Sequence, residues 1–402
     1  MTLESQKLYQ RRRLIGATAV TAVLAAAGLT SSALAANAAT PPVLTSLTYT
    51  ATGPGGGLRL PVGVSAFNGT VYVSNSSANV VAALANGTTT AIAGLLTNFG
   101  EHGDGGPAVS ASLYHPGGTA VDSKGDVFVA DSGDNVVREI TATGVIRRVA
   151  GTGIAGLGLT SPFGFPAVLS SLDYSQDVAV DAHGNLYIAD TYNNRVVKVT
   201  PQGLAVTVAG DGVAGYSGDG RPAAFAELNQ PNGVAVDAQG NLYIADSANN
   251  VIRRVDAKTR VITTVAGDYA ADKANGGLGG FSGDGGAATS AQLNDPQGVA
   301  VDGAGDLFIA DTFNNAIREV TPAGIISTVV NSASAGGGIP AAGGESSGKA
   351  PTASKLNSPY GVAIDPSSAA LYIADTHNSE IAEVTGLAQS GDAAGPTASA
   401  HS

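Results

Sequence analysis

A short phrase returns six times along this chain, and it restricts the possible folds more than any other feature. Its clearest copies begin at Pro231 and Pro296 and read Pro-x-Gly-Val-Ala-Val-Asp, then Leu-Tyr/Phe-Ile-Ala-Asp, then Asn-Asn. The aspartate that ends the second part recurs about every 60 residues, a period typical of repeated supersecondary units that bury their faces by stacking on one another. These aspartates are Asp131, Asp190, Asp246, Asp311 and Asp375, with Asn75 in the first copy.

One copy of the phrase and its flanks predicts four short β-strands, at residues 233–237, 242–245, 251–255 and 261–265. The second strand is apolar on both faces, which indicates a sheet packed between two other sheets. We therefore expect an all-β fold, a six-bladed β-propeller of four-stranded antiparallel blades. The centre of each first strand carries a small residue, as expected for the crowded strands nearest the axis: Ser65, Ala120, Ala179, Ala235, Ala300 and Ala363.

The two ends of the repeat array predict how the ring closes. The sixth copy has no convincing fourth strand, whereas a spare strand, Val43–Tyr49, precedes the first copy. We expect this N-terminal strand to complete the last blade, because a closed ring leaves no open sheet edge. The propeller would then span residues 43–388, with a linker at 36–42 and a disordered Ser/Ala/Gly-rich tail at 389–402.

Residues 1–35 have the pattern of a cleaved signal peptide, with Arg11, Arg12 and Arg13 ahead of an apolar stretch and small residues. The arginines are compatible with either a twin-arginine or a general secretory signal, so we predict a secreted, extracellular protein without membrane insertion. The chain has no cysteine and a formal net charge of −12. So acidic a chain argues against nucleic acid as a partner. We also expect the protein to be a monomer.

The repeated phrase resembles the NHL repeat, as do the connecting segments Tyr216–Ala223 and Phe281–Ala288. The resemblance covers nearly all of the chain after the signal peptide and implies a six-bladed propeller like those of extracellular bacterial sensor domains. The third copy departs from the pattern, since Ser175-Gln176-Asp177 replaces Pro-x-Gly. The resemblance does not define an activity, because similar propellers bind proteins or RNA and others are lyases or lactonases.

Most residues that suggest chemistry are better explained by structure. An aspartate copied in nearly every blade is expected to hold a turn through backbone N–H groups. The Gly-Asp-Gly loops around Asp104, Asp219 and Asp284 could bind calcium, but they lack the alternating oxygen donors and the final glutamate of a calcium loop. Of five histidines, only His115 lies beside the start of a first strand, which disfavours a three-histidine zinc site. We expect no cofactor.

The x position of Pro-x-Gly differs between copies and predicts a ligand site. These residues begin the six inner strands, so they should ring one mouth of the axial channel. Amides, one aromatic and one acid can hydrogen-bond a polar ligand. With His115 just before one such strand and Asp177 in place of a glycine, the predicted ligand-binding residues are His115, Gln176, Asp177, Asn232, Gln297 and Tyr360.

Two functions agree with this sequence. The first is a secreted binding scaffold for a protein, peptide or cell-envelope glycan at the channel mouth, without catalytic or metal-binding residues. The alternative is an extracellular lactonase- or lyase-type enzyme with a metal in the axial channel. The diversity of the x positions beside uniform scaffold positions favours the first, and the sequence leaves open whether any catalysis occurs.

Overall fold

The computed structural model describes residues 42–47, 50–52, 57–96, 100–159, 161, 163–331 and 356–387. All of them belong to one compact unit, Pro41–Ser402. The predicted signal peptide, nearly all of the linker and the predicted tail lie outside the described residues. Within the described part of the chain, no helix has the length and apolarity needed to cross a membrane.

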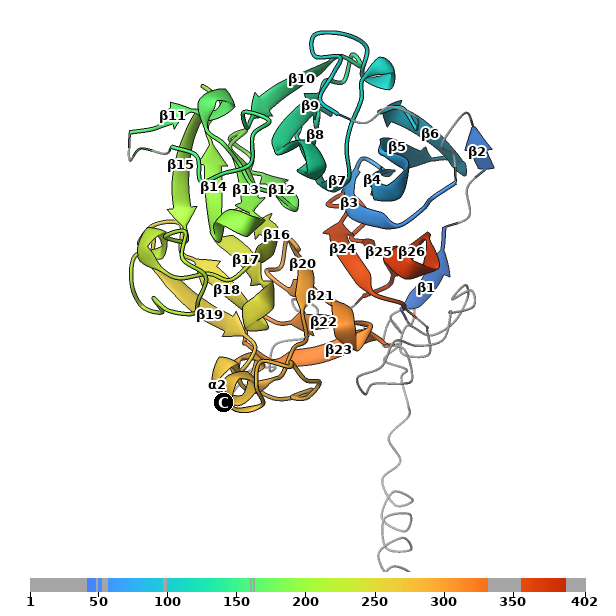
Figure 1. Ribbon diagram of the computed structural model, residues 1–402. Helices are drawn as coiled ribbons and strands as arrows, with labels where there is room; N and C mark the ends of the chain where they lie inside the picture. The colour runs from blue at the N-terminus through green and yellow to red at the C-terminus, as the bar shows by residue number, and fades with distance from the viewer. Residues whose placement is uncertain are drawn as a thin grey trace, which may run out of the picture. The chain divides into compact units, whose positions relative to one another are not determined.

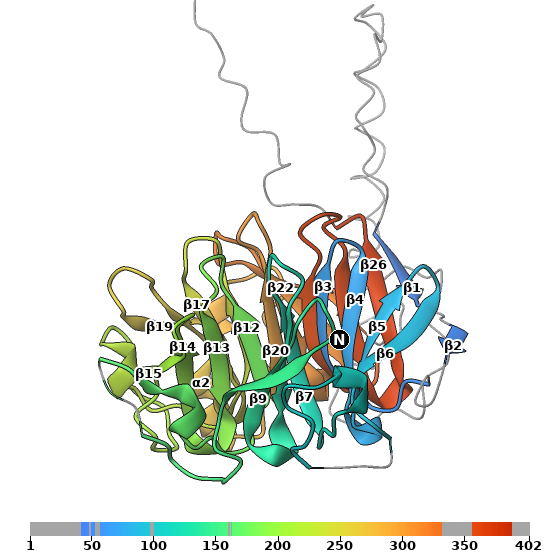
Figure 2. The ribbon, with the colours of Figure 1, turned by 90° about the horizontal axis from the view of Figure 1, so that it is seen from above.

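Six β-sheets follow one another around a central axis (Figure 1), and their strands run side by side along that axis (Figure 2). This confirms the predicted six-bladed propeller. Blades 1 to 3 consist of β3 (Pro61–Phe67), β4 (Thr70–Asn75), β5 (Val80–Ala85) and β6 (Thr88–Ala93); β7 (Pro116–Val121), β8 (Val127–Asp131), β9 (Val136–Ile140) and β10 (Ile146–Ala150); and β12 (Asp177–Val180), β13 (Leu186–Asp190), β14 (Arg195–Val199) and β15 (Leu204–Ala209).

Blades 4 and 5 repeat this order, and blade 6 takes three strands from the C-terminal part of the chain. They consist of β16 (Pro231–Val236), β17 (Leu242–Asp246), β18 (Val251–Val255) and β19 (Ile262–Ala266); β20 (Pro296–Val301), β21 (Leu307–Asp311), β22 (Ala316–Val320) and β23 (Ile326–Asn331); and β24 (Pro359–Ile364), β25 (Leu371–Asp375) and β26 (Glu380–Thr385). A short helix, α2 (Tyr269–Ala274), lies between blades 4 and 5.

The N-terminal strand closes the ring as predicted. β1 (Val43–Ser46) is the fourth strand of blade 6 and pairs antiparallel with β26, from Val43 opposite Thr385 to Ser46 opposite Ala382. Leu44 is fully buried in the core shared by blades 5 and 6. Two sheets gain a short fifth strand that the sequence does not predict: β2 (Thr50–Thr52) beside β6, and β11 (Phe165–Pro166) beside β15.

The second strand of each blade shows why a single repeat cannot bury its own faces. All five residues of β17 are buried, because both faces of the sheet are covered by neighbouring blades. Ala235 and Tyr243 of blade 4 pack in one cluster with Val299 and Ile309 of blade 5. Burying an aliphatic side chain of this kind contributes about 1.5–3 kcal/mol, so each interface stabilises two blades at once.

A one-turn 3₁₀ helix follows each second strand and connects neighbouring blades. In blade 3 it is η5 (Thr191–Asn193), and Asn194 ends it in the left-handed conformation that asparagine tolerates well. The Oδ1 of Asn194 accepts a hydrogen bond from the Gln230 backbone N–H of blade 4 at 3.0 Å. The Thr191 hydroxyl donates to the Pro231 carbonyl at 2.9 Å. The same hydroxyl bond closes the ring, from Thr376 of blade 6 to the Pro61 carbonyl of blade 1 at 2.6 Å.

Candidate ligand-binding site

The six first strands surround a cavity of about 290 Å³ along the axis. Each first strand pairs with the second strand of its blade on one side only, so its other edge faces the axis. The small residues at the strand centres, Ser65 and its five alanine counterparts, line this cavity as the sequence predicts. Valines and these small residues form much of the wall, so Asp177 and the polar side chains at the x positions supply much of its polarity.

A ring of glycines brings neighbouring first strands into close contact near one end of the cavity. The third residue of Pro-x-Gly is Gly63, Gly118, Gly233, Gly298 or Gly361, and a Cβ atom on each would collide with the next blade. At Gly63, for example, it would lie 2.5 Å from the Gly117 carbonyl oxygen. Such close approach of two backbones requires glycine. We call these five glycines the glycine collar; blade 3 carries Asp177 in this position instead.

The structure brings five of the six predicted site residues together around the axis. Gln176, Asp177, Asn232, Gln297 and Tyr360 all line the axial cavity. His115 does not; it lines a second hollow of about 250 Å³, which shares Val62, Gln176 and Tyr360 with the axial cavity. The two hollows therefore adjoin at these shared residues, and His115 lies on the outer side of them, among residues of the blade 1 and blade 6 3₁₀ helices.

Sequence reasoning missed Tyr174, which also lines the second hollow. Its ring stacks on that of Tyr192, with centroids 5.1 Å apart and planes at 14°. The signal was present in the sequence, because Tyr174 precedes the first strand of the irregular third copy just as His115 precedes that of the second. All six residues in this position have a positive φ between 47° and 51°, the left-handed region that is strained for most side chains: Leu60, His115, Tyr174, Gln230, Asp295 and Ser358.

Burial raises the pKa of the acidic groups at this end of the channel. The pKa of Asp177 is raised to about 7 by desolvation, although the backbone N–H groups of Val234 and Val178 lower it. The pKa of Asp295 is also raised by burial, against a hydrogen bond from Gln297. Burial raises the pKa of Tyr360, with a further contribution from the charge of Asp295. A carboxyl group with a pKa near neutrality in a hollow is a candidate for function.

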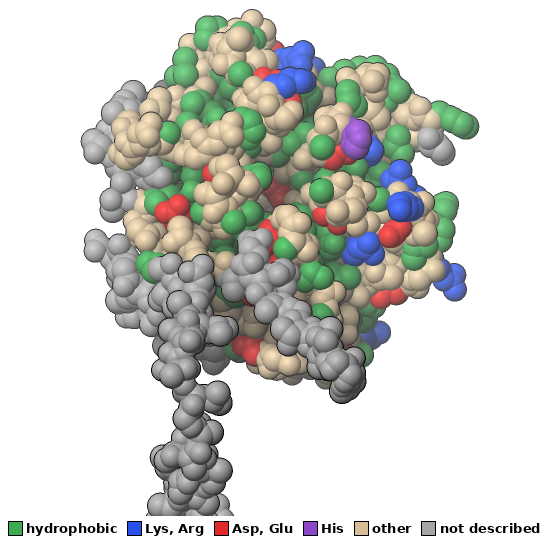
Figure 3. Space-filling view, turned by 180° about the vertical axis from the view of Figure 1, so that it is seen from behind, with side chains coloured by type: hydrophobic (Ala, Val, Ile, Leu, Met, Phe, Trp, Pro, Cys, Tyr) green, Lys and Arg blue, Asp and Glu red, His purple; other side chains and the backbone are tan. Residues whose placement is uncertain are grey.

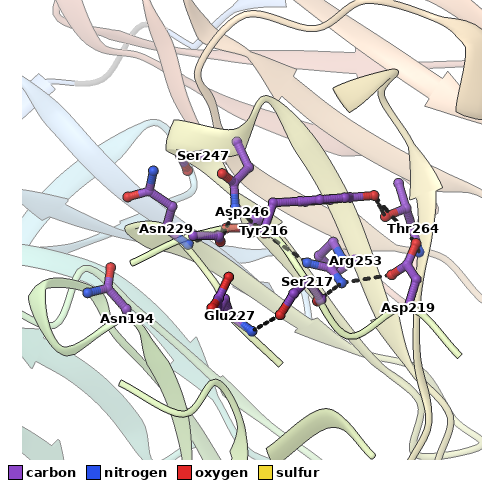
Figure 4. Close-up of polar contacts among 12 residues, drawn as sticks. Asn194, Tyr216, Ser217, Asp219, Glu227, Asn229, Asp246, Ser247, Arg253 and Thr264 are labelled. Atoms are coloured by element: carbon purple, nitrogen blue, oxygen red, sulfur yellow. Dashed lines mark hydrogen bonds and ion pairs between the residues drawn. The ribbon is translucent and has the colours of Figure 1, made fainter. Parts of the chain in front are cut away.

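The repeated aspartates, in contrast, form internal contacts. Asp246 accepts a hydrogen bond from the backbone N–H of Asn229 at 2.7 Å (Figure 4). It also forms an ion pair with the buried Arg253 at 3.2 Å. Arg253 forms a second ion pair, at 2.7 Å, with Asp219 of the Gly-Asp-Gly loop. These contacts agree with the expected structural role of the aspartates. The backbone N–H group that each one binds, however, is not in the turn that follows it. No side chain of these aspartates caps its own 3₁₀ helix; the bonded N–H precedes the first strand of the blade.

Two sister blades contain the same network. Arg138 and Arg318 are fully buried and connect Asp131 with Asp104 and Asp311 with Asp284. The aspartates of the loops considered for calcium are therefore engaged by arginines. Among the described residues, no three His, Cys, Asp or Glu side chains are grouped so that they could hold a metal ion.

The fold and this hollow define a class: a closed six-bladed propeller with an axial pocket whose polar lining varies from blade to blade. The model of the teneurin NHL domain matches residues 71–163, 212–276 and 279–378, and that of the NHL repeat matches residues 172–199. The chain belongs to the NHL-repeat family of β-propellers and is matched over most of its length by the teneurin NHL domain.

Curated relatives are similar to part of the chain, and solved structures share its fold. Human teneurin-4 is 31% identical over 232 residues, which are 54% of this chain but only 8% of teneurin-4. A Bacteroides thetaiotaomicron protein of unknown function has a TM-score of 0.59 at 15% identity, covering 86% of this chain and 76% of its own. An auxiliary nutrient binding protein from the same organism has a TM-score of 0.58 at 14% identity, covering 85% and 76%. At this identity the structures show a shared fold.

Proposed function

We propose that this protein is a secreted binding module that holds a protein, peptide or cell-envelope glycan at the mouth of its axial channel, without catalysing a reaction. One observation carries the proposal: the x positions, which differ between blades, converge on adjoining hollows, whereas the uniform positions form internal contacts. A rigid scaffold that displays variable side chains in a concave surface is the usual design of a binding protein.

A combined variant tests the site. Gln176, Asn232, Gln297 and Tyr360 are replaced together by alanine, and binding of the labelled protein to arrays of peptides and of cell-wall glycan fragments is compared with wild type. We expect the variant to lose the wild-type array signals while its melting temperature stays within a few degrees, because all four side chains face a hollow.

Substitution of Gln202 and Gln239 by alanine gives the matched control, since both are exposed in turns at the opposite ends of blades 3 and 4. Equal array signals from wild type and the four-residue variant would overturn the site. Turnover of lactone substrates by wild type, lost in the same variant, would favour the lactonase-type alternative.

Export is part of the proposal and has its own test. It is supported by the basic and then apolar composition of residues 1–35, which are followed by small residues. We expect protein recovered from the culture medium to begin at about residue 36 or 39 when its N-terminus is sequenced. An intact N-terminus on protein confined to the cells would contradict export.

A further inference from the structure

The side chain of Asp177 lines the axial cavity. In the other five blades the glycine collar leaves no room for a side chain, so Asp177 alone among these positions projects one. Its Oδ2 accepts the backbone N–H of Val234, in blade 4, at 3.0 Å. Its Oδ1 occupies the place that a Cβ on Gly118, in blade 2, would take. The carboxyl group therefore extends between the two blades that flank its own.

This acid has no counter-ion in the described part of the chain. Asp177 takes part in none of the ion pairs there, and it is the single charged residue among those that line the cavity. The inner strands packed around it, β7, β16, β20 and β24, contribute no Lys, Arg or His to the lining, and Tyr360 is their one titratable group. Asp295, whose pKa burial also raises, is an acid as well and supplies no cation. On the face seen in Figure 3, the Lys and Arg side chains lie away from the centre of the ring.

A buried carboxylate without a cation is costly unless something compensates for it. The scaffold arginines show that this fold can supply a cation to a buried aspartate, as Arg253 does to Asp246. Asp177 also remains partly exposed to the cavity rather than covered by side chains. The uncompensated charge is thus at the one place where a ligand could neutralise it.

We propose that the axial cavity binds a primary ammonium group, with the carboxylate of Asp177 as its counter-ion and the ring of Tyr360 beside it. This inference rests on the proposed function and specifies the chemistry of its ligand. An ammonium group donates three hydrogen bonds and is attracted to the face of an aromatic ring. A volume of about 290 Å³ suits a short alkylammonium chain, whether this is a free diamine or the side chain of a peptide lysine.

The raised pKa of Asp177 gives the proposal a pH signature. Since burial raises this pKa to about 7, the group is largely protonated at pH 6 and largely ionised at pH 8. An alkylamine stays protonated over this range, because its pKa is near that of lysine, about 10.4. Binding should therefore strengthen by about tenfold from pH 6 to pH 8.

The experiment is calorimetric titration of the full chain, after removal of its signal peptide, with 1,5-diaminopentane, with Nα-acetyl-lysine amide, and with the neutral 1,5-pentanediol. We expect both amines to bind and the diol not to bind. Stronger binding of the lysine amide would indicate a peptide, and stronger binding of the diamine a free amine. Asp177→Asn should weaken amine binding at least tenfold and abolish its pH dependence.

Two further variants keep the test decisive. Asp177→Gly restores the residue of the other five blades and replaces Asp177→Asn if that variant does not fold. Asp256→Asn removes the same charge from a turn at the opposite end of blade 4 and should leave binding unchanged. Equal binding of amine and diol, or unchanged amine binding in the folded Asp177 variants, overturns the proposal. A further outcome is that the amines fail to bind while the arrays still give signals with the wild type that the four-residue variant loses. In that case the proposed function stands and the ammonium proposal is wrong.

Discussion

The Oδ2 atom of Asp246 lies 3.2 Å from the Nη1 atom of Arg253, and both side chains are fully buried. Replacing Arg253 by methionine would leave Asp246 without its cation and Asp219 without its strongest contact. Removing one partner of a buried pair typically costs about 3–5 kcal/mol, and we expect a loss of this size in the free energy of unfolding, measured with denaturant.

The neighbouring Arg254 offers a matched control. It is partly exposed and pairs with Asp256 at 3.2 Å, so Arg254→Met should cost less than about 1 kcal/mol. Similar losses in the two variants would show that the Asp246–Arg253 pair contributes no more than a surface pair.

Blade 6 keeps the repeated aspartate but lacks the arginine, since Ala382 lies where blade 4 has Arg253. The pKa of Asp375 is raised to about 7, mainly by burial and with a smaller contribution from the charge of Glu380. Because the pKa is higher in the folded than in the unfolded chain, the folded state loses stability as the pH rises from about 4 to about 7. At pH 8 the penalty reaches about 4 kcal/mol. We expect Asp375→Asn to flatten the fall in unfolding free energy between pH 5 and pH 8.

Blade 1 naturally carries the residue that the Asp375→Asn variant introduces, so the opposite substitution can be made there. Asn75 already replaces the aspartate there, and Ala82 occupies the arginine position. Asn75→Asp should therefore steepen the same pH dependence. If neither substitution changes the slope, Asp375 ionises as an ordinary carboxyl group.

The glycine collar predicts a pair of alanine substitutions in blade 5 with different outcomes. A Cβ on Gly298 would collide with the Tyr360 carbonyl oxygen of blade 6, whereas one on Gly303 would meet no atom within 4 Å. Overpacking of this kind costs about 1–3 kcal/mol. We expect Gly298→Ala to lower the melting temperature by several degrees and Gly303→Ala to leave it nearly unchanged. A tolerated Gly298→Ala would mean that the inner strands can move apart.

Ring closure through β1 is tested by deleting residues 43–50. This removes the strand paired with β26 and the buried side chain of Leu44, and it exposes the edge of blade 6. We expect the sharp thermal transition followed by circular dichroism to broaden or disappear. A truncated chain that melts as sharply as the intact one would contradict closure by this strand.

Sequence periodicity was sufficient to predict the ring, its closure and the convergence of the x positions, because all three follow from strand order and alternation. It did not predict the buried arginines. In Val251-Ile-Arg-Arg-Val255 the arginines resemble solvent-facing positions of a half-exposed strand, yet the face of Arg253 is covered by the Gly-Asp-Gly loop. A signal did exist: the arginine is present in the three copies whose preceding loop carries Asp104, Asp219 or Asp284, and alanine replaces it in the first and sixth copies.

The position of Asp177 was predicted, but its surroundings were not. Its place in the Pro-x-Gly register put it at the channel mouth, whereas the lack of a counter-ion depends on side chains from several inner strands. His115 lines the adjoining hollow, and the register alone does not show in which direction a left-handed residue ahead of the strand points. Three-dimensional crowding at the collar determines which side chains enter the cavity.

The first and last strands of the propeller, β1 and β26, share one blade, so the order in which this protein can fold is constrained. Five blades consist of consecutive strands and can form while later residues are still being added. The sixth needs partners about 340 residues apart, and joining segments so distant is entropically slow. The ring can therefore close only after the last strand has been synthesised. A chain whose synthesis stops earlier would keep an unpaired strand edge that can associate with other chains.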